Sequence, residues 1–468
     1  MTSPDVAKGQ KAPPPIVNNS YSLDLFQGPV TTAARVIGLA GAYAGLAEGC
    51  EGEYSNAAAP AVRTPYSLGK WDYDVALGFT NPGAFKGSDF ENLGPQYTSL
   101  PTRFSNSVTL NAGLEVQFDS VGITVDVDEL RFGVQGPAAA LAQSDMVINR
   151  VTASIANAFL DDQLILGVGF RAMTFGLNQQ IDGALQGFLS GAGANSQFGG
   201  ILKPRNAPFR IGATLRPEIT VGSIQGTAAS PGGVQVADNK ILPSTIVMPW
   251  EVEAGGVVEL GRRPLNPPRA DLSYAEQEIR ARYDERRLER AAGYKEELRA
   301  APDTAREALR RRLELDELAL EAHENREINE KIARIVASQK ALAELWDRRQ
   351  MLLVFGVLVT GPTANGVGLS DFLAQLRSPS GQSTVLSARL AFETEVIRNW
   401  VLLRGGTYLE PARYADTQSR EHFTLGVDLR LFAFNPFHLF GDDPWQLRLA
   451  SDGAARYFNW AVTLGKYR

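Results

Sequence analysis

The sequence has few of the residues that build common catalytic and metal sites. Among its 468 residues there is one cysteine, Cys50, and there are three histidines, His323, His422 and His438. A single cysteine excludes a disulfide within the chain and a cysteine-based zinc site, and no histidine has acidic or cysteine neighbours at metal-ligand spacing. A serine–histidine pair such as Ser387 with His422 has no residue to orient it. We therefore predict no metal, no cofactor and no enzymatic activity.

Three further absences bear on the class and location of the protein. The formal net charge is -6, and basic residues mostly have acidic neighbours, so the chain lacks the clustered positive charge that nucleic-acid binding requires. No apolar run approaches 18 residues, which excludes a transmembrane helix but not a barrel, because half of a barrel's strand residues face its lumen. The first residues, MTSPDVAKGQKAPPPIVNN, also lack the apolar segment of a signal peptide.

The chain does contain a strand pattern of membrane-spanning length. From Trp71 to Thr80, WDYDVALGFT, apolar residues alternate without interruption with polar or small ones. Successive side chains of a strand point to opposite faces, so one face is apolar and the other carries Asp72 and Asp74. A tilted transmembrane strand needs about 9–11 residues, whereas strands of soluble proteins average about 5–6. The length therefore favours a membrane strand.

Similar segments follow to the end of the chain, and we count fourteen, although twelve would also be defensible. They lie near residues 71–80, 106–118, 121–133, 147–160, 163–176, 207–216, 219–226, 245–260, 350–360, 385–396, 400–410, 421–434, 445–451 and 456–467. Alternate connections are mostly tight, as at 119–120, 161–162, 217–218 and 398–399, while the others are mostly long. Outer-membrane barrels have short periplasmic turns and long outer loops. This sorting predicts an all-β, 14-stranded antiparallel outer-membrane barrel, and a soluble β-protein is the alternative.

Tryptophans near the tight connections predict where the membrane boundary lies. Trp71, Trp400 and Trp445 all fall beside tight connections, where aromatic side chains would form a girdle at the lipid–water interface. Asp72 and Asp74 then face the lumen, where we expect them to meet water or the amides of an inner segment.

Residues 271–349 interrupt the strand pattern with a highly charged segment. They contain 19 acidic and 17 basic residues with one proline, Pro302, which separates two predicted helices. Apolar residues at heptad-like spacing would form the seam of a helical hairpin that projects into the periplasm and could bind a periplasmic or cell-wall partner. These candidate partner-binding residues are Ile328, Ile332, Ile335 and Leu342. A solvated spacer without a partner is the alternative.

The segment Ala34 to Ala61, ARVIGLAGAYAGLAEGCEGEYSNAAAPA, resembles the amino-terminal hatch of the FadL family of outer-membrane transporters and of the related PorV-type barrels. The family frame is filled by Gly38, Gly41, Ala42, Tyr43, Ala47, Tyr54, Asn56 and Ala57. One departure is that proline follows Asn56 only at Pro60. Later segments at 208–217, 242–256 and 402–414 also resemble family strands. The resemblance implies a fourteen-stranded barrel whose hatch lies in the lumen and which releases lipophilic compounds through its wall.

Within that frame we predict ligand-binding residues in three places. Tyr43, Tyr54 and Asn56 belong to the hatch, and Asp72 and Asp74 face the lumen. In the loop 181–200, apolar residues at helical spacing predict a short amphipathic helix that serves as a lid or simply caps the barrel. Its candidate residues are Leu185, Phe188 and Leu189.

The resulting organisation has five parts and leaves two functions open. We expect a partly disordered extension (1–33), a hatch (34–66), eight barrel strands (67–260), the helical hairpin (261–349) and six further strands (350–468). The chain would lie in the outer membrane of a Gram-negative bacterium, in contact with its lipid, and pass hydrophobic small molecules. The alternative is a PorV-like scaffold whose hairpin docks a partner without transport. Partners do not include nucleic acid.

Overall fold

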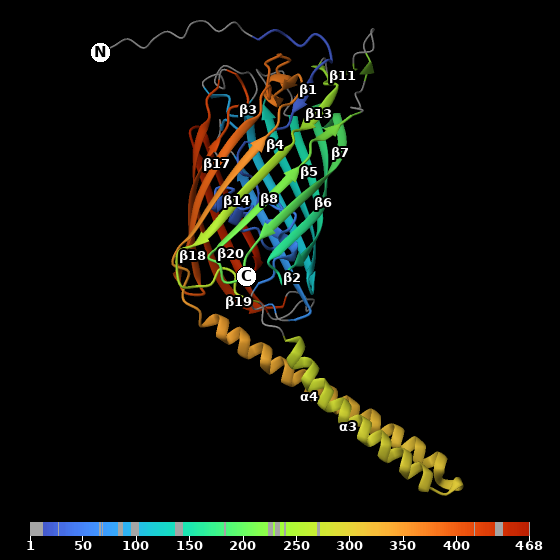
Figure 1. Cartoon of the computed structure of the whole chain (residues 1–468). Helices are drawn as coiled ribbons and strands as arrows, with labels where there is room; N and C mark the ends of the chain where they lie inside the picture. Colours follow the sequence, from blue (N-terminus) through green and yellow to red (C-terminus); the bar gives the residue numbers. More distant parts are fainter. Residues whose placement is uncertain are drawn as a thin grey trace. The chain divides into compact units, whose positions relative to one another are not determined.

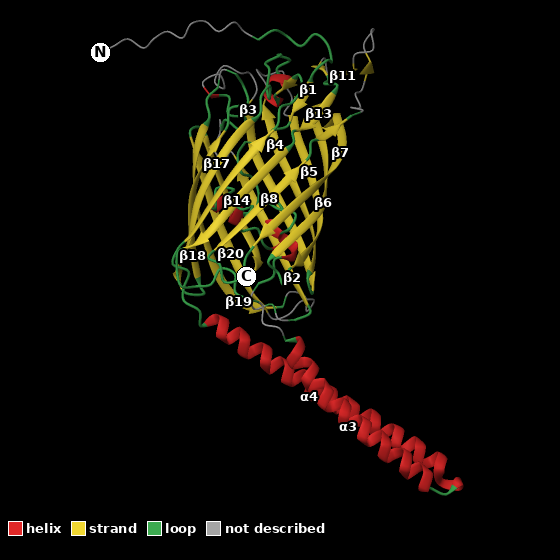
Figure 2. Ribbon diagram, in the orientation of Figure 1, coloured by secondary structure: helices red, strands yellow, loops and turns green. Residues whose placement is uncertain are grey.

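The protein, described from a computed structural model, contains a closed antiparallel barrel (Figures 1 and 2). The structure describes residues 13–26, 28–64, 67, 69–82, 88–94, 103–135, 144–181, 184–222, 228–229, 235–237, 240–268, 272–415, 417–435 and 443–467. It divides into two units, which are described separately. One holds the barrel with residues 1–63, and the other holds 64–70 with 267–346.

Fourteen strands of the described residues close the barrel, which confirms the predicted count and fold class. They are β2 (Trp71–Pro82), β3 (Arg103–Phe118), β4 (Val121–Gln135), β5 (Ser144–Phe159), β6 (Leu164–Ile181), β7 (Ala184–Leu202), β8 (Phe209–Arg216), β14 (Glu251–Glu259), β15 (Leu352–Thr360), β17 (Val385–Ile397), β18 (Val401–Glu410), β19 (Arg420–Phe434), β20 (Asp443–Ala454) and β21 (Tyr457–Lys466). β21 pairs with β2, so the barrel has no free edge.

The count is right although one strand was assigned wrongly. Residues 184–202 form β7, whereas the described part of the segment 219–226, residues 219–222, contributes the short β9 (Ile219–Val221), which lies outside the barrel. The predicted tight turn at 217–218 is therefore wrong, because these residues begin the long connection between β8 and β14. The missed strand and the wrongly assigned one compensate outside this region, so β6 and β14 keep their predicted directions, whereas β8 between them runs opposite to its predicted direction.

The outer surface of the barrel is apolar, as the alternation requires. Along β3 and β4, exposed large apolar residues such as Leu114, Val116 and Val125 alternate with buried polar ones such as Glu115 and Thr124. An outward apolar band with a polar interior is typical of outer-membrane barrels. Among the described residues, no helix is both long and apolar enough to cross a membrane.

The predicted aromatic girdle is only partly present. Trp71 and Trp400 are 60% and 59% exposed, as membrane-boundary residues should be. Trp445 is not, because Phe434 stacks on it at 4.9 Å between ring centroids and its indole nitrogen donates to the Phe434 carbonyl at 3.0 Å. Covered in this way, Trp445 is 6% exposed.

The two ends of the barrel differ. At the short-turn end lie the connections β3–β4 and β5–β6, and at the long-loop end lie the described residues of the β8–β14 connection and residues 361–384. Two connections at the long-loop end are nevertheless short, because only residues 182–183 join β6 to β7 and residues 455–456 join β20 to β21. The long loops and residues 22–24 also form a small sheet. Its strands, in spatial order, are β16 (Gly366–Val367), β1 (Ser22–Asp24), β13 (Thr245–Met248) and β9. The long loops also hold β10 (Ala228–Ala229), β11 (Gln235–Ala237), β12 (Lys240–Ile241) and α5 (Leu369–Leu373).

Residues 28–63 lie inside the barrel, and we call them the plug (Figure 1). The plug contains α1 (Ala34–Gly38), α2 (Gly49–Gly52) and the 3-10 turn η1 (Ala59–Ala61). It begins near the long-loop end, where the Val30 amide donates to the Tyr408 hydroxyl at 3.2 Å. It ends near the short-turn end, where Arg63 donates to the carbonyl of Asp119 in the β3–β4 turn at 3.4 Å.

The second unit is a helical hairpin of α3 (Ser273–Ala300) and α4 (Asp303–Glu344), inserted between β14 and β15. Ile328 is 2% exposed. The Tyr283 hydroxyl donates to Glu327 at 2.9 Å, and Arg290 bridges Glu317 and Glu324. Ile328 is thus part of the hairpin's own buried seam, which corrects its assignment as a partner-binding residue.

Other predicted seam residues of the hairpin are more open. Ile332 and Ile335 are half-buried, and Leu342 is 55% exposed. The most exposed apolar side chains of α4 include two that the heptad pattern did not select, Leu315 and Leu318, at 67% and 63%.

Candidate functional site

Close backbone contacts seat the plug against the barrel wall. A side chain added at Gly38 of the plug would meet the Cα of Gly426 on β19 at 3.2 Å, and one added at Gly167 on β6 would overlap the carbonyl of Ala57. Only glycine permits such an approach of two main chains. The glycine- and alanine-rich sequence of the plug therefore reflects close packing inside the barrel.

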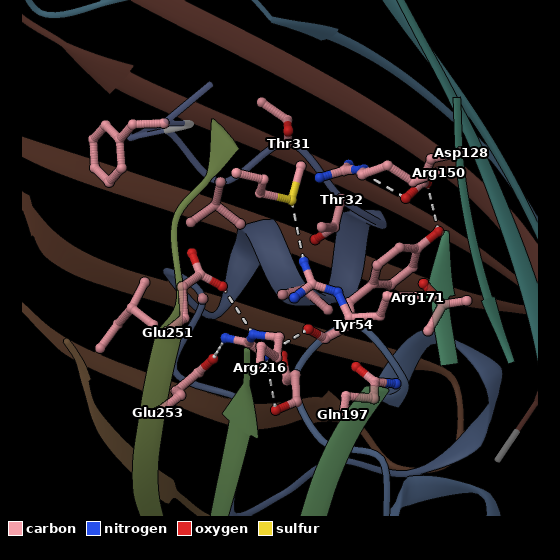
Figure 3. Close-up of a pocket in the computed structure, with 18 of the residues that line it drawn as sticks. Thr31, Thr32, Tyr54, Asp128, Arg150, Arg171, Gln197, Arg216, Glu251 and Glu253 are labelled. Atoms are coloured by element: carbon pink, nitrogen blue, oxygen red, sulfur yellow. Dashed lines mark hydrogen bonds and ion pairs between the residues drawn. The ribbon is translucent and has the colours of Figure 1, made fainter. Parts of the chain in front are cut away.

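Side-chain hydrogen bonds hold the turn at residues 53–56 of the plug, and two of the residues that make them, Tyr54 and Asn56, are predicted ligand-binding residues. The Tyr54 hydroxyl donates to Asp128 on β4 at 2.6 Å (Figure 3). The Asn56 amide donates to the carbonyls of Ala44 and Gly200 at 3.0 and 3.1 Å. A hydrogen bond to a charged acceptor contributes roughly 1.5–3 kcal/mol, so Tyr54 is a substantial anchor of the plug.

Tyr43 has a different position from that of Tyr54. It is fully buried, Arg35 lies 5.3 Å from its ring centroid, and Arg35 pairs with Glu48 at 2.9 Å. Tyr43 therefore packs against other residues of the plug and is not among the residues that line the cavity described below.

The two aspartates of the first strand serve as anchors of other elements. Asp72 pairs with Lys466 on β21 at 2.7 Å, and Asp74 accepts the Cys50 amide of α2 at 3.1 Å. The expectation that these carboxylates meet amides of the inner segment fits the position of Asp74. Neither residue lines the cavity described below.

The predicted lid helix is wrong for the described residues, because β6 ends at Ile181 and Ala184–Leu202 form the barrel strand β7. Leu189 is 1% exposed and packs in the apolar cluster of the long-loop end. Leu185 and Phe188 also lie in β7, but their side chains are outside the described part of the structure. The helical spacing misled the prediction because glycine and serine obscure the period of two in this strand.

Large apolar side chains line the inner face of β4 to β7 near the long-loop end. We call these residues the apolar lining; they are Leu130, Phe132, Met146, Ile148, Met173, Phe175, Leu177 and Leu189. A water-filled porin has a polar interior, so this lining is unusual for a general pore. Methionine side chains adapt to ligands of different shape, and two belong to this set.

Next to the apolar lining, a cavity of about 140 Å³ lies between the plug and the barrel wall (Figure 3). Eight acidic or basic side chains contribute to its wall: Arg150, Arg171, Arg216, Arg389, Glu53, Asp128, Glu251 and Glu253. Leu25, Ile219 and Met248 of the apolar cluster also line it, so the cavity adjoins the apolar region.

Three of the four arginines are paired with carboxylates. Arg150 meets Asp128 at 3.3 Å, Arg216 meets Glu251 and Glu253 at 2.9 and 2.6 Å, and Arg389 meets Glu253 at 3.2 Å. Arg171 has no carboxylate within ion-pair distance in the described structure. Its guanidinium donates to the Met248 sulfur at 3.3 Å, and its Nη1 is buried without a partner among the described residues.

Glu53 of the plug adds a second polar group that is only partly satisfied. Its Oε1 accepts hydrogen bonds from Ser154 and Gln197, whereas its Oε2 is buried without a partner in the described structure. Burial raises the pKa of Glu53 to about 8, although the two hydrogen bonds oppose this effect. At neutral pH the carboxyl group is therefore mostly protonated, which leaves three other carboxyl groups in the cavity wall to face the four guanidinium groups. The excess positive charge lies at Arg171.

Ion pairs below the cavity complete the polar interior. Arg404 is 1% exposed and is paired with Asp428 on β19 and, at 2.5 Å, with Glu393 on β17. Arg448 joins this network to the plug through Glu51 at 2.9 Å. The Glu393–Arg404 pair was open to sequence reasoning, because inward positions of neighbouring strands carried opposite charges.

The sequence shows no residue that would orient His422, whereas the structure supplies two. Its Nδ1 lies 2.8 Å from Asp452 and its Nε2 lies 2.8 Å from Glu410. Ser387 is not among its recorded partners. Within the described chain no group of three acidic, histidine or cysteine side chains is placed to hold a metal ion.

Comparison with known proteins gives relatives by structure alone. No family profile matches the sequence, and no curated protein sequence matches it. Among solved structures, the CymD monoaromatic hydrocarbon channel is 10% identical over 94% of this chain and 97% of its own, with a TM-score of 0.49. A Pseudomonas aeruginosa FadL homologue is 9% identical over 96% of this chain and 99% of its own, with a TM-score of 0.48. The Pseudomonas putida toluene transporter TodX is 9% identical over 96% of this chain and 99% of its own, with a TM-score of 0.47. The chain is similar to FadL-type barrels. A relation to PorV-type barrels stays a prediction.

Proposed function

We propose that this protein is a channel for hydrophobic compounds in the outer membrane of a Gram-negative bacterium, closed by its plug. One observation carries the proposal: the inner wall of the barrel is apolar near the long-loop end, where outside molecules would enter. Burying an apolar group is worth about 25 cal/mol per Å² of apolar surface, so such a wall attracts compounds that water does not. Polar solutes gain nothing from it.

The cavity beside the apolar lining supports a narrower class of compound, an amphiphile with an anionic or carbonyl end. Arg171 offers an unpaired guanidinium, and protonated Glu53 offers a hydroxyl, so both groups can donate hydrogen bonds to one acceptor. The apolar part of the same molecule would lie against Met248 and the apolar lining.

Passage requires the plug to move, because residues 28–63 occupy the barrel interior. The contacts that hold the turn at 53–56 are polar and come from single side chains such as Tyr54. Interactions of this kind can be exchanged for hydrogen bonds to water or ligand at modest net cost. A conformational change of the plug is therefore compatible with an intact barrel.

Uptake by whole cells tests the proposal. Cells that express the protein should take up radiolabelled dodecanoate faster than cells that express Phe175→Asp. An alkyl chain that packs against the new carboxylate must remove it from water, which costs free energy. The matched control is Phe170→Asp on the lipid-facing side of β6, analysed only if it reaches the membrane. Uptake of a sugar should not differ among the strains. Equal dodecanoate uptake with Phe175→Asp at wild-type abundance would contradict the proposal.

The hairpin supports a second candidate function, the docking of a periplasmic partner. Leu315 and Leu318 lie three residues apart on α4 and are mostly exposed, so they form one apolar spot that α3 does not cover. Replacing residues 268–348 by a short linker separates the two functions. Unchanged dodecanoate uptake with loss of a co-purifying partner would assign docking to the hairpin, and loss of uptake at normal abundance would assign it a part in transport.

A further inference from the structure

The beginning of the chain forms a strap at the long-loop end that the transport proposal does not use. Residues 13–26, which we call the strap, run from a contact with loop 361–384 to the plug. The Ile16 amide donates to the carbonyl of Gln375 at 2.8 Å, and the Arg377 amide donates to that of Pro14 at 2.8 Å. The strap is thus bound to the loop by main-chain hydrogen bonds.

At its centre the strap supplies the strand β1 between two strands of the long loops. Ser22 to Asp24 pair in parallel with Thr245 to Val247 of β13, and Ser22 and Leu23 pair with Gly366 and Val367 of β16. None of these partners is a barrel strand. The strap therefore binds as an added strand does in peptide recognition, and the barrel can close without it.

One buried ion pair fixes the register of the strap. Asp24 accepts two hydrogen bonds from Arg413, at 3.1 and 3.2 Å, and further ones from Thr363 and Ser380 at 2.8 and 2.9 Å. The side chains of Asp24 and Arg413 are 0% and 2% exposed. Buried ion pairs contribute little net stability but penalise a wrong register, because displacement leaves a buried charge unpaired.

The side chains of the strap lie where a hydrophobic compound would bind. Tyr21, Leu23 and Leu25 are 1%, 0% and 6% exposed, and they belong to the same packed cluster as the apolar lining. Leu25 also lines the cavity that contains Arg171. A compound that packs against the lining must therefore take the place of these side chains.

We propose that residues 21–25 act as an intramolecular ligand, which occupies the apolar binding region until a hydrophobic compound displaces it. The inference rests on the proposed function, because it assumes that this region takes hydrophobic compounds. The binding-competent molecules are those whose strap has left its slot between β13 and β16. The strap also leads directly into the plug, whose Val30 is held by Tyr408 and Asn459, so its departure loosens the outer end of the plug.

A reversible disulfide tests the proposal in a single preparation. The Thr245 hydroxyl donates to the Ser22 hydroxyl at 2.9 Å, so the double variant Ser22→Cys/Thr245→Cys places two sulfurs across the strap and β13. The native thiol, Cys50, is buried and does not compete. Oxidation should lock the strap, and a reductant should release it, which mass spectrometry can verify.

Binding of radiolabelled dodecanoate is then measured with the protein in lipid nanodiscs. Affinity falls in proportion to the fraction of competent molecules, so we expect about tenfold weaker binding after oxidation if the lock removes nine-tenths of them. Reduction should restore wild-type binding. Asp24→Asn, which needs no disulfide, should bind more tightly than the wild type, whereas Val17→Ser, at an exposed strap position, should be unchanged.

The outcomes separate the inference from the function on which it rests. Equal binding in the verified oxidised and reduced states, with Asp24→Asn equal to wild type, overturns the inference and leaves the transport proposal intact. Absence of dodecanoate binding in every state, wild type included, contradicts the proposed function and the inference with it. If the disulfide does not form, the comparison of Asp24→Asn with wild type decides.

Discussion

Replacing Arg171 by methionine should weaken binding of anionic amphiphiles and spare that of neutral ones. A hydrogen bond to a charged group contributes roughly 1.5–3 kcal/mol, which corresponds to a loss of affinity for dodecanoate of about 10- to 150-fold. Dodecanol carries no charge and should bind within about twofold of its wild-type affinity, because methionine preserves the apolar stem of the arginine.

The same substitution should leave the protein folded, since Arg171 has no carboxylate within ion-pair distance in the described structure. Arg216→Met is the contrast, because it leaves the carboxylates of Glu251 and Glu253 without their closest partner and should cost about 3–5 kcal/mol. The assay is equilibrium binding of both ligands in nanodiscs, with Arg131→Met, an exposed position, as the control. Equal losses for dodecanoate and dodecanol, or no loss for either, would refute the role of Arg171.

Three further predictions concern the plug and the outer loops. Tyr54→Phe removes the hydrogen bond to Asp128 and should raise the frequency of channel openings in planar bilayers about 10- to 100-fold; an unchanged record would show that this bond does not hold the plug. Gly167→Leu should allow the barrel to close, as seen by heat-modified gel mobility, but should displace the plug at Ala57 and raise conductance. Burial raises the pKa of Glu91 to about 7, so its contribution to stability is complete below about pH 4.5 and is lost as the pH rises through 7. The wild type should therefore lose more thermal stability between pH 5 and pH 8 than Glu91→Gln, and equal losses would disprove this.

Strand alternation predicted most of the barrel, and it failed where small residues replace the pattern. β7 reads ALQGFLSGAGANSQFGGIL, and glycine is uncommon in strands. The glycines are required by neighbours that the sequence does not place: a side chain at Gly193 would meet Ile219 at 2.9 Å, and one at Gly199 would overlap Asn56 of the plug. Such a requirement exists only once the tertiary contacts are known.

The candidate site was also predictable only in part, because some of its residues are distinguished only by contacts in the folded barrel. Tyr54 and Asn56 were selected from a motif, and both anchor the plug. Arg171 is one of several inward arginines, and only the assembled barrel distinguishes it, because the others find carboxylates on neighbouring strands. The sequence predicts a partly disordered extension over residues 1–33, and within it the strap pairs with β13 and β16, two strands that lie more than 200 residues away in the sequence. The residues of the strap do not themselves reveal so distant a pairing.

The location of a bound hydrophobic compound tests the central claim most directly. A fatty acid with a diazirine on its alkyl chain can be bound in nanodiscs, activated by light and mapped by mass spectrometry of the labelled peptides. Specific labels are those that persist when extra lipid is added to the nanodiscs and disappear when excess dodecanoate is added. We predict that these labels fall on inward residues such as Met146, Met173 and Phe175. Labels confined to outward residues such as Leu114, Val168 and Phe170 would mean that the compound meets only the lipid-facing surface, and would contradict a channel for hydrophobic compounds.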